Sequence, residues 1–207
     1  KEAQNAELWP SQRQAIAQAL YILDNQGSVL IADPTGSGKT RVGVNLLYSV
    51  INRKWKSALY RLPSAVVIAP PLIQDICWRK EGGEGFESAI HLISSGILST
   101  KRSDVYRRAI EKLRNCSILL IDEAHNFLNF ASARSKTIAY NTADNVILST
   151  ATPINRTVSD IFRLVEILGL DNLSRDVLEI YYKHKNRNQF SEDELVRLRE
   201  QIKNFTV

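Results

Sequence analysis

The sequence has no methionine, only two cysteines and only three histidines among its 207 residues. Cys77 and Cys116 show neither the spacing of a metal site nor a disulfide framework, so we expect buried, reduced thiols. Long hydrophobic runs are also missing, because the longest apolar stretches are far too short to cross a bilayer. No charged and then apolar leader opens the chain, so nothing indicates secretion. We therefore expect a cytoplasmic or otherwise intracellular protein without a membrane partner, and the missing methionine at position one suggests a trimmed fragment.

The chain also has no internal repeat, no low-complexity tract and no linker rich in proline and glycine. Short apolar runs alternate with segments of helical period, which is typical of an α/β fold with a mainly parallel sheet between helices. Nearly continuous apolar character is expected of strands whose two faces are both covered by helices. The predicted strands are 28–32, 65–69, 89–94, 117–121 and 145–149. The predicted helices are 11–23, 39–51, 103–115, 157–169 and 191–205.

The end of the chain differs from the rest, because only helices are predicted from about residue 171 onward. Ser191 and Glu194 form the pattern of a capping box, and apolar residues then follow along one side of a helix. A length of 207 residues suits one sizeable α/β domain with a short addition. We therefore predict a domain at 1–170 and a helical extension at 171–207.

The segment "ADPTGSGKT" at 32–40 joins a predicted strand to a predicted helix, which is the context of a phosphate-binding loop. Small residues there let backbone N–H groups point at phosphate oxygens, and the helix N-terminus adds a positive field. Lys39 would reach the β and γ phosphates of ATP, and the Thr40 hydroxyl would bind Mg²⁺. An aspartate stands where such loops usually begin with glycine. The predicted nucleotide-binding residues of the loop are Asp33, Pro34, Thr35, Gly36, Ser37, Gly38, Lys39 and Thr40.

The segment "ILLIDEAH" places two carboxylates at the carboxyl end of a predicted buried strand. In an open parallel sheet, ligands bind at this edge. Asp122 would hold Mg²⁺, and Glu123 would orient and deprotonate the attacking water. An acidic turn exposed to solvent is the simpler interpretation of these two residues, but the upstream phosphate loop argues against it. A lone histidine is usually a packed or solvent-facing residue. The position of His125 leaves a second interpretation open, in which it relays between the nucleotide site and a nucleic-acid groove.

Taken together, "TGSGKT", "DEAH" and "LSTATPINRTVSDIFRLVEIL" resemble the first RecA-like lobe of a superfamily 2 helicase, with a RecA-like P-loop NTPase fold. More narrowly, the chain is similar to Swi/Snf-type DNA-translocating ATPases and their bacterial relatives. Asp33 agrees with the family variant A-D-x-x-G-x-G-K-T. Pro34 and Thr35 depart from the usual Glu and Met, which favours a divergent bacterial member. The resemblance covers residues 8–168, and in this family a helical insertion often begins where the predicted tail starts.

The resemblance also assigns roles to other segments. Gln12 in "LWPSQRQAI" corresponds to a glutamine that reads adenine. "VVIAPPLIQDICWRKE" is similar to the segment called Ia, "HLISSG" to Ib and "STATP" to motif III, which couples the ATP site to the DNA site. The residues that this similarity implies for nucleic-acid contact or coupling, besides His125, are Pro70, Pro71, Ser94, Ser95, Gly96, Ser149, Thr150 and Thr152.

The resemblance implies an ATP hydrolase that uses ATP and Mg²⁺, with duplex DNA and a second RecA-like lobe, absent from this chain, as partners. That lobe would supply an arginine finger, so we expect little activity from this chain alone. The net charge of +5 permits a nucleic-acid partner without requiring one. Three alternatives stay open: a DEAD- or DEAH-type RNA helicase lobe, the motor part of a restriction complex, and a nucleotide-dependent switch or scaffold.

Overall fold

The computed structural model describes residues 7–34, 36–57, 63–100, 103–129, 132–139, 141–151, 159–170, 173–184 and 190–207. Its strands are β1 Ser28–Ile31, β2 Ala65–Ala69, β3 Ile90–Ser94, β4 Ile118–Asp122 and β5 Asn145–Ser149. Its α-helices are α1 Pro10–Gln26, α2 Lys39–Ser57, α3 Pro71–Ile73, α4 Arg79–Gly82, α5 Phe86–Ala89, α6 Asp104–Asn115, α7 Ala133–Ala139, α8 Ser159–Leu168, α9 Arg175–His184 and α10 Glu192–Lys203.

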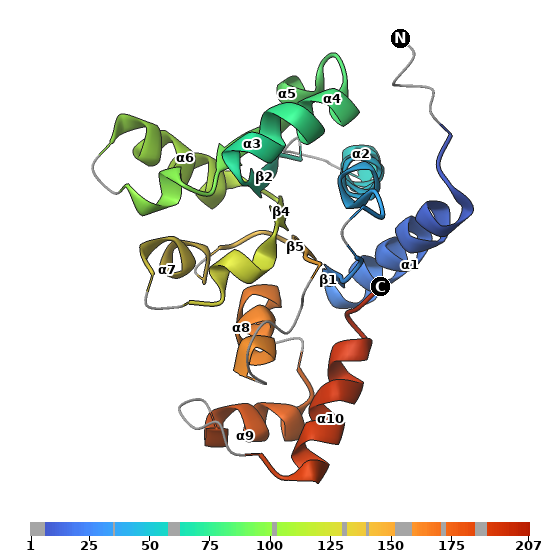
Figure 1. Ribbon diagram of the computed structural model, residues 1–207, viewed down its shortest axis with the longest axis vertical. Coiled ribbons are helices and arrows are strands. Elements are labelled where there is room, and N and C mark those ends of the chain that lie inside the picture. Colours follow the sequence, from blue (N-terminus) through green and yellow to red (C-terminus); the bar gives the residue numbers. More distant parts are fainter. Residues whose placement is uncertain are drawn as a thin grey trace.

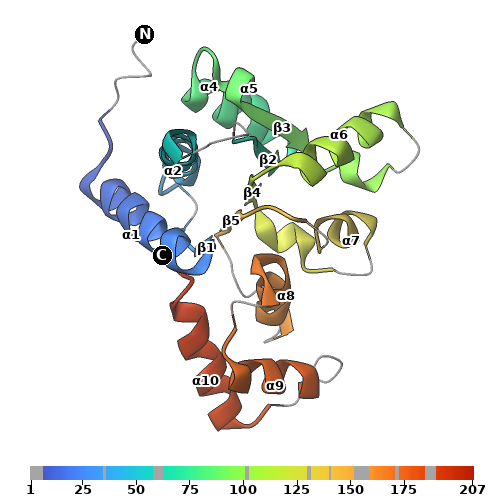
Figure 2. The ribbon, with the colours of Figure 1, turned by 180° about the vertical axis from the view of Figure 1, so that it is seen from behind.

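In the described part of the chain, the five strands form one parallel sheet in the order β1-β5-β4-β2-β3, with helices on both faces (Figure 1). The register places Asp122 beside Ser149 and Ala69 beside Ser94. Since all the strands run in one direction, the segments that follow them emerge at the same edge of the sheet. Figure 2 shows β3 at one side of the sheet, near α5 and α6.

Two hydrophobic clusters cover the two faces of the sheet, because successive residues of a strand point to opposite sides. On one face, Val29, Val67 and Leu120 pack with α1, α2 and the segment that contains Trp78. On the other face, the intervening strand residues pack with α6, α7, α8, α9 and α10. The continuous apolar runs of the strands are therefore explained by burial on both sides.

The predicted fold class is confirmed, and the five predicted strands are present within one residue of their expected ends. The predicted helices correspond to α1, α2, α6, α8 and α10. The capping box is also present, since Ser191 Oγ accepts a hydrogen bond from the Glu194 backbone N–H. Both cysteines are free thiols, as predicted, although only Cys116 is buried and Cys77 is half-buried. Within the described ranges, none of the helices combines the length and the apolar character that a membrane crossing requires.

The expectation of helices alone beyond residue 171 is wrong for the last residues of the chain. Leu30 and Thr206 form a parallel β-bridge, and the Val207 backbone N–H donates to the Leu30 carbonyl at 2.9 Å. The C-terminus accordingly lies beside β1 in both ribbon views (Figures 1 and 2). Helices α9 and α10 share one hydrophobic cluster with α8 and the sheet. The division of the chain at residue 170 stays a prediction.

Candidate active site

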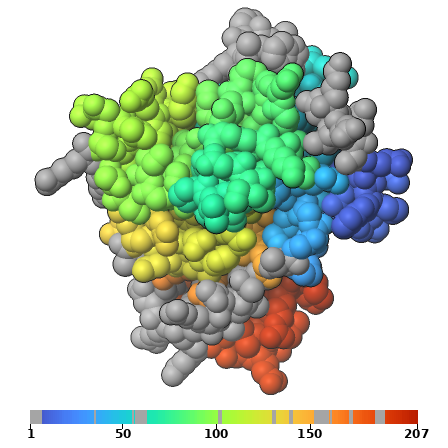
Figure 3. Space-filling model, turned by 45° about the horizontal axis from the view of Figure 1, so that its top comes forward, coloured from blue at the N-terminus to red at the C-terminus, as the bar shows by residue number. Residues whose placement is uncertain are grey.

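Apart from Gln12 on α1, the described residues predicted for the site lie at the carboxyl ends of strands or in the segments that follow them. The phosphate loop follows β1, Pro70 and Pro71 follow β2, and Ser95 and Gly96 follow β3. Asp122 ends β4 and Ser149 ends β5. Figure 3 shows parts of the blue, teal and yellow segments that follow β1, β2 and β4 next to one another on one face. Thr35 and Thr152 lie outside the described residues.

The phosphate loop has the backbone geometry that its glycines predict. Gly36 and Gly38 have φ values of 88° and 83°, which side chains other than glycine rarely adopt. Lys39 begins α2, and its ammonium donates to the carbonyls of Asp33 and Pro34, at 2.9 Å each. Two main-chain oxygens of the loop therefore fix the position of the Lys39 ammonium group.

Gln12 packs directly against this loop. Its Nε2 donates to the Ser37 carbonyl at 3.2 Å, and its Oε1 accepts from the Trp9 backbone N–H at 3.0 Å. Only 4% of Gln12 is exposed. A Cβ added at Gly38 would lie 2.5 Å from Gln12 Nε2, so a glycine at this position is what allows the close approach. Recognition of adenine by Gln12 stays a prediction.

Asp122 is buried, with 5% of its surface exposed, and both of its oxygens accept hydrogen bonds. The indole Nε1 of Trp78 donates to Oδ2 at 2.9 Å, and the Glu123 backbone N–H donates to Oδ1 at 3.0 Å. Both donors are neutral, so they orient the carboxylate without cancelling its charge. A buried carboxylate with remaining lone pairs suits a cation or a metal-bound water.

Glu123 has left-handed backbone angles, φ 51° and ψ 51°, and is the one residue other than glycine with positive φ in the described part of the chain. Such a conformation costs about 1–2 kcal/mol and is concentrated at functional sites. It turns the chain sharply at the end of β4. His125 Nδ1 lies 3.3 Å from Glu123 Oε2 and 3.1 Å from Thr150 Oγ1. The imidazole therefore bridges the segments that follow β4 and β5.

Thr150 also connects β5 to the start of the phosphate loop. Its side chain is fully buried, and its backbone N–H donates to the Ile31 carbonyl at 3.0 Å. Ser149 Oγ and Ser37 Oγ are buried and have no hydrogen-bond partner among the residues that the structure describes. Two orphaned hydroxyls at this edge, one of them within the loop, fit a site for a polar ligand.

The segments after β2 and β3 contact each other. The Ser95 backbone N–H donates to the Ala69 carbonyl at 3.0 Å, and Ser94 Oγ accepts from the Gly96 N–H at 3.3 Å. Ser95 is buried, whereas Gly96 is exposed. Pro71 is the first residue of α3, which continues through the π-helical turn Gln74–Trp78 into α4. Contacts of these residues with nucleic acid stay predictions.

Basic residues gather in two segments of the sequence, 101–114 and 181–190, which the structure describes only in part. Arg107 forms an ion pair with Asp104 at 3.0 Å on α6, and Lys183 binds Glu194 at 2.7 Å. Both pairs neutralise part of the positive charge that the sequence places on these segments. Lys101, Arg102, Lys185 and Arg187 lie outside the described residues.

The residues fit ATP and Mg²⁺, which the family resemblance implies. Lys39, the glycine turn and the Ser37 hydroxyl, which has no hydrogen-bond partner among the described residues, would together form a cradle for phosphates. Within the described ranges, there is no group of three or more His, Cys, Asp or Glu side chains that could hold a metal ion by itself. Mg²⁺ needs no such cage, since it commonly binds through one or two carboxylates together with substrate phosphates. Thr40 and Asp122 would provide this protein share of the ligands.

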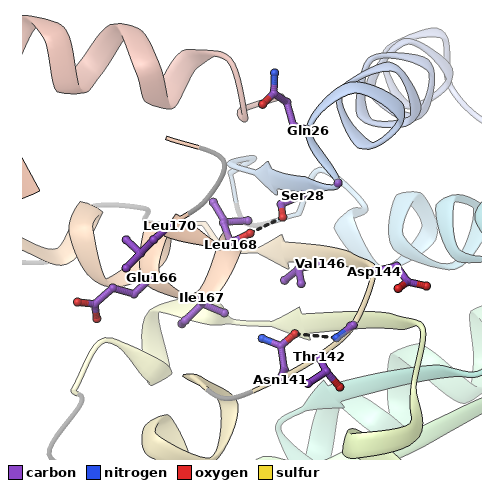
Figure 4. Close-up of a pocket in the computed structure, with 13 residues that line it drawn as sticks. Gln26, Ser28, Asn141, Thr142, Asp144, Val146, Glu166, Ile167, Leu168 and Leu170 are labelled. Atoms are coloured by element: carbon purple, nitrogen blue, oxygen red, sulfur yellow. Dashed lines mark hydrogen bonds between the residues drawn. The ribbon is translucent and has the colours of Figure 1, made fainter. Parts of the chain in front are cut away.

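A cavity lies at the opposite edge of the sheet from the candidate site (Figure 4). It has a volume of about 520 Å³ and lies beside the amino ends of β1 and β5, where Ser28 Oγ donates to the Leu168 carbonyl. None of the residues predicted for the site lines it. The cavity is therefore separate from the candidate site.

Two functional features were not predicted from the sequence. Trp78 contacts the predicted Mg²⁺ ligand Asp122, although it precedes that residue by 44 positions. Arg41 on α2 binds Glu81 on α4 through two hydrogen bonds of 3.0 and 3.1 Å. The tryptophan in the segment called Ia is the sequence feature that could have indicated the contact between Trp78 and Asp122. Arg41 and Glu81 have opposite charges, but their spacing in the sequence does not predict that they pair.

A family profile and the sequences of known proteins indicate the same family for this chain. The profile of the SNF2-related domain matches residues 89–207. Helicase SWR1 of Candida albicans is 24% identical over 180 residues, which are 78% of this chain and 11% of that protein. The DNA repair and recombination protein RAD54 of Oryza sativa subsp. japonica is 24% identical over 165 residues, or 69% of this chain and 17% of that protein. The chain thus spans a small part of the curated relatives that it matches.

A solved structure has the same fold. The Sulfolobus solfataricus SWI2/SNF2 ATPase core in complex with dsDNA superposes with a TM-score of 0.69 at 20% sequence identity. The alignment covers 99% of this chain and 45% of that chain, so it includes the phosphate loop that the family profile does not reach.

Proposed function

The chain belongs to the SNF2-related domain family, and from this premise we propose that it is the ATP-binding lobe of a DNA-dependent ATPase that moves along duplex DNA. The observation that carries the proposal is that the phosphate loop follows β1, and Asp122 ends β4 with Glu123 directly after it, at the same edge of one parallel sheet. In such sheets the carboxyl edge is the usual ligand site. The fold shared with the SWI2/SNF2 ATPase core supports it.

The loop residues would bind the nucleotide phosphates. Lys39 would exchange the carbonyls of Asp33 and Pro34, 2.9 Å from its ammonium, for the β and γ phosphates. The N–H groups between Gly36 and Thr40 and the Ser37 hydroxyl would donate to phosphate oxygens. Gln12, already against the loop, would face the adenine base once its present hydrogen bonds are exchanged.

The end of β4 would orient the attacking water. Mg²⁺, when bound by Thr40 and Asp122, supplies charge stabilisation for the phosphates. Glu123 would accept the proton of the water, and its left-handed backbone aims its side chain away from the path of the strand. His125 and Thr150 would hold the Glu123 carboxylate in place through the bridge at 3.3 and 3.1 Å.

A second RecA-like lobe would complete the nucleotide cleft. Such a lobe would supply an arginine finger, which typically contributes about 10³ to 10⁵ in rate. We therefore expect this chain alone to bind nucleotide weakly and to hydrolyse it slowly. We also propose that the protein that carries this lobe is intracellular and is a bacterial-like member of the family.

Duplex DNA would lie along the segments that follow β2 and β3. One similar structure is described as a complex with dsDNA, and one relative is named as a DNA repair and recombination protein. Pro70, Pro71, Ser94 and Gly96 would contact the DNA backbone, and Thr150 would couple that contact to the ATP site. Backbone contacts need no sequence recognition, which suits movement along DNA.

The test is ATP hydrolysis by the protein that carries this lobe, without polymer and with duplex DNA, single-stranded DNA or RNA. Duplex DNA should stimulate turnover most. Glu123→Gln should lower the rate about 10²- to 10⁴-fold while nucleotide binding persists. Glu179→Gln, an exposed carboxylate on α9, is the matched control and should retain full activity.

Stimulation by RNA alone would replace the proposal with an RNA helicase. Bound nucleotide without turnover under any condition would replace it with a switch or scaffold. A DNA-stimulated rate that Glu123→Gln leaves unchanged would refute the assignment of Glu123.

A further inference from the structure

Trp78 lies at the end of the π-helical turn Gln74–Trp78, between the segment after β2 and the nucleotide site. Its side chain is 1% exposed, and its indole N–H donates to Asp122 Oδ2 at 2.9 Å. A π-turn shifts the direction of the residues that follow it relative to a regular α-helix, and such turns are frequent at functional sites. The turn therefore aims a neutral donor at the carboxylate proposed to hold Mg²⁺.

The two hydrogen bonds to Asp122 fix its carboxylate group from two sides. Trp78 binds Oδ2 and the Glu123 N–H binds Oδ1, so neither oxygen can rotate freely. An ionised carboxylate offers about four lone-pair directions, and two of them stay available for a metal or its water. The indole N–H has no acceptor capacity of its own, so it cannot compete with Asp122 for a cation.

We infer that Trp78 is the positioning residue for Asp122 and that it sets the affinity of the site for Mg²⁺, an inference that rests on the proposed function. Partners that hold a ligating carboxylate typically change metal affinity or activity about 10- to 100-fold when they are removed. Trp78 acts through Asp122 and does not touch the nucleotide itself in this inference.

The surroundings of Trp78 keep the indole in this orientation. A Cβ added at Gly43 of α2 would lie 2.8 Å from Trp78 Cη2, so the ring rests directly on the helix that begins with the phosphate loop. The Phe86 ring also packs against the indole, at a centroid distance of 6.4 Å. Arg41 of α2 and Glu81 hold the same segment through two hydrogen bonds. One indole thus contacts the two elements that carry the proposed Mg²⁺ ligands.

A purely structural role is the competing explanation, because a buried tryptophan contributes to packing wherever it occurs. Trp78→Phe keeps an aromatic ring at this position but removes the N–H, and its shorter ring also gives up the contact of Trp78 Cη2 with Gly43. The unfolding of the variant therefore has to be measured beside its Mg²⁺ dependence. The matched control is Trp9→Phe, because Trp9 is 57% exposed. Thermal unfolding of both variants reports any loss of packing.

The first experiment uses a fluorescent ATP analogue with a methylanthraniloyl group, excited directly so that the number of tryptophans does not affect the signal. Its binding to the 207-residue chain is followed by anisotropy in EDTA and in a Mg²⁺ titration. Trp78→Phe should raise the half-maximal Mg²⁺ concentration about 10- to 100-fold and leave the affinity in EDTA within about twofold. Trp9→Phe should change neither value.

A folded Trp78→Phe variant with the Mg²⁺ dependence of the wild type would overturn the inference. An equal loss of affinity in EDTA and in Mg²⁺ would do the same, because it would indicate a structural defect. A wild-type chain that binds no nucleotide at all would instead contradict the proposed function.

The second experiment tests the contact without altering Trp78, so it also decides the matter if Trp78→Phe does not fold. The indole ¹H–¹⁵N signal of Trp78 is assigned by its loss in a Trp78→Phe spectrum or by selective labelling. Asp122→Asn replaces a charged acceptor with a neutral one and should move this signal upfield, while the Trp9 signal stays in place. An indole signal that does not respond to Asp122→Asn would refute the contact on which the inference depends.

Discussion

Replacing Gly38 with alanine should destabilise the chain more than the same replacement at Gly36, although both residues lie in one loop with nearly the same backbone angles. Their φ values are 83° and 88°. An alanine in this region costs about 1–2 kcal/mol relative to a normal conformation. Among the residues that the structure describes, nothing lies within 4 Å of a Cβ added at Gly36, so backbone strain is the expected effect there.

A Cβ added at Gly38 meets an additional obstacle. It would lie 2.5 Å from Gln12 Nε2, whereas ordinary van der Waals contact begins at 3.4 Å. Gln12 would have to retreat, and its hydrogen bond to the Ser37 carbonyl, already 3.2 Å long, would break. An unsatisfied group in a residue that is 4% exposed costs about 1–3 kcal/mol. Gly38→Ala should therefore cost about 1–3 kcal/mol more than Gly36→Ala.

The assay is urea unfolding of the wild type, both glycine variants, Gln12→Ala and the two double variants. For a chain of this size, each kcal/mol corresponds to a melting shift of about 2–4 °C, so calorimetry gives a second measure. In the Gln12→Ala background the obstacle is absent, and the difference between the glycine variants should fall below about 0.5 kcal/mol. Equal losses for Gly36→Ala and Gly38→Ala, or a difference that persists without Gln12, would refute this reasoning.

Two further predictions concern ionisation. The hydrogen bond from Lys183, with others from the Ser191 N–H and His184, lowers the pKa of Glu194 from 4.5 to about 2. The ionised Glu194 therefore stabilises the fold fully above about pH 4.5, and this stabilisation is lost as the pH falls toward 2. The unfolding midpoints of the wild type and of Glu194→Gln should accordingly converge over that range. Burial raises the pKa of the Cys116 thiol to about 11. In a Cys77→Ser variant, the native chain should therefore resist a thiol reagent at about pH 8 and react with it once unfolded, and rapid labelling of the native chain would contradict this.

The sheet could be predicted because its strands are buried on both faces. Val67 faces one hydrophobic cluster and Val66 the other, so the whole run 65–69 must be apolar. Helix α9 lies in the region predicted to be helical, although its bounds were not predicted, and the helices between Pro71 and Ala89 were not predicted at all. In the latter segment, prolines and a cluster of glycines interrupt the helical period. The β-bridge at Thr206 could not be predicted either, because a single residue has no period and the pairing depends on β1.

The residues of the candidate site could be predicted from the sequence, but the contacts between them could not. The motifs placed Lys39 after the loop that follows β1, and Asp122 and Glu123 at the end of β4, and the parallel sheet brings these two strand ends to one edge. The contacts of Lys39 with two carbonyls depend on the fold of the loop, and that of Trp78 with Asp122 depends on a π-turn. Neither follows from residue type, since both require the course of the backbone.

The contacts around the loop indicate how nucleotide binding would reach the rest of the chain. Lys39 holds the carbonyls of Asp33 and Pro34, and the preceding residue, Ala32, donates its N–H to the Val207 carbonyl at 3.1 Å. Release of the ammonium to a phosphate would therefore free two carbonyls next to a residue that holds the C-terminal segment. Coupling between sites requires an element with two discrete arrangements, and a lysine that exchanged these carbonyls for phosphate oxygens would be such an element. We expect Val207 to report the change, because its hydrogen bond lies one residue from the carbonyls that Lys39 would leave.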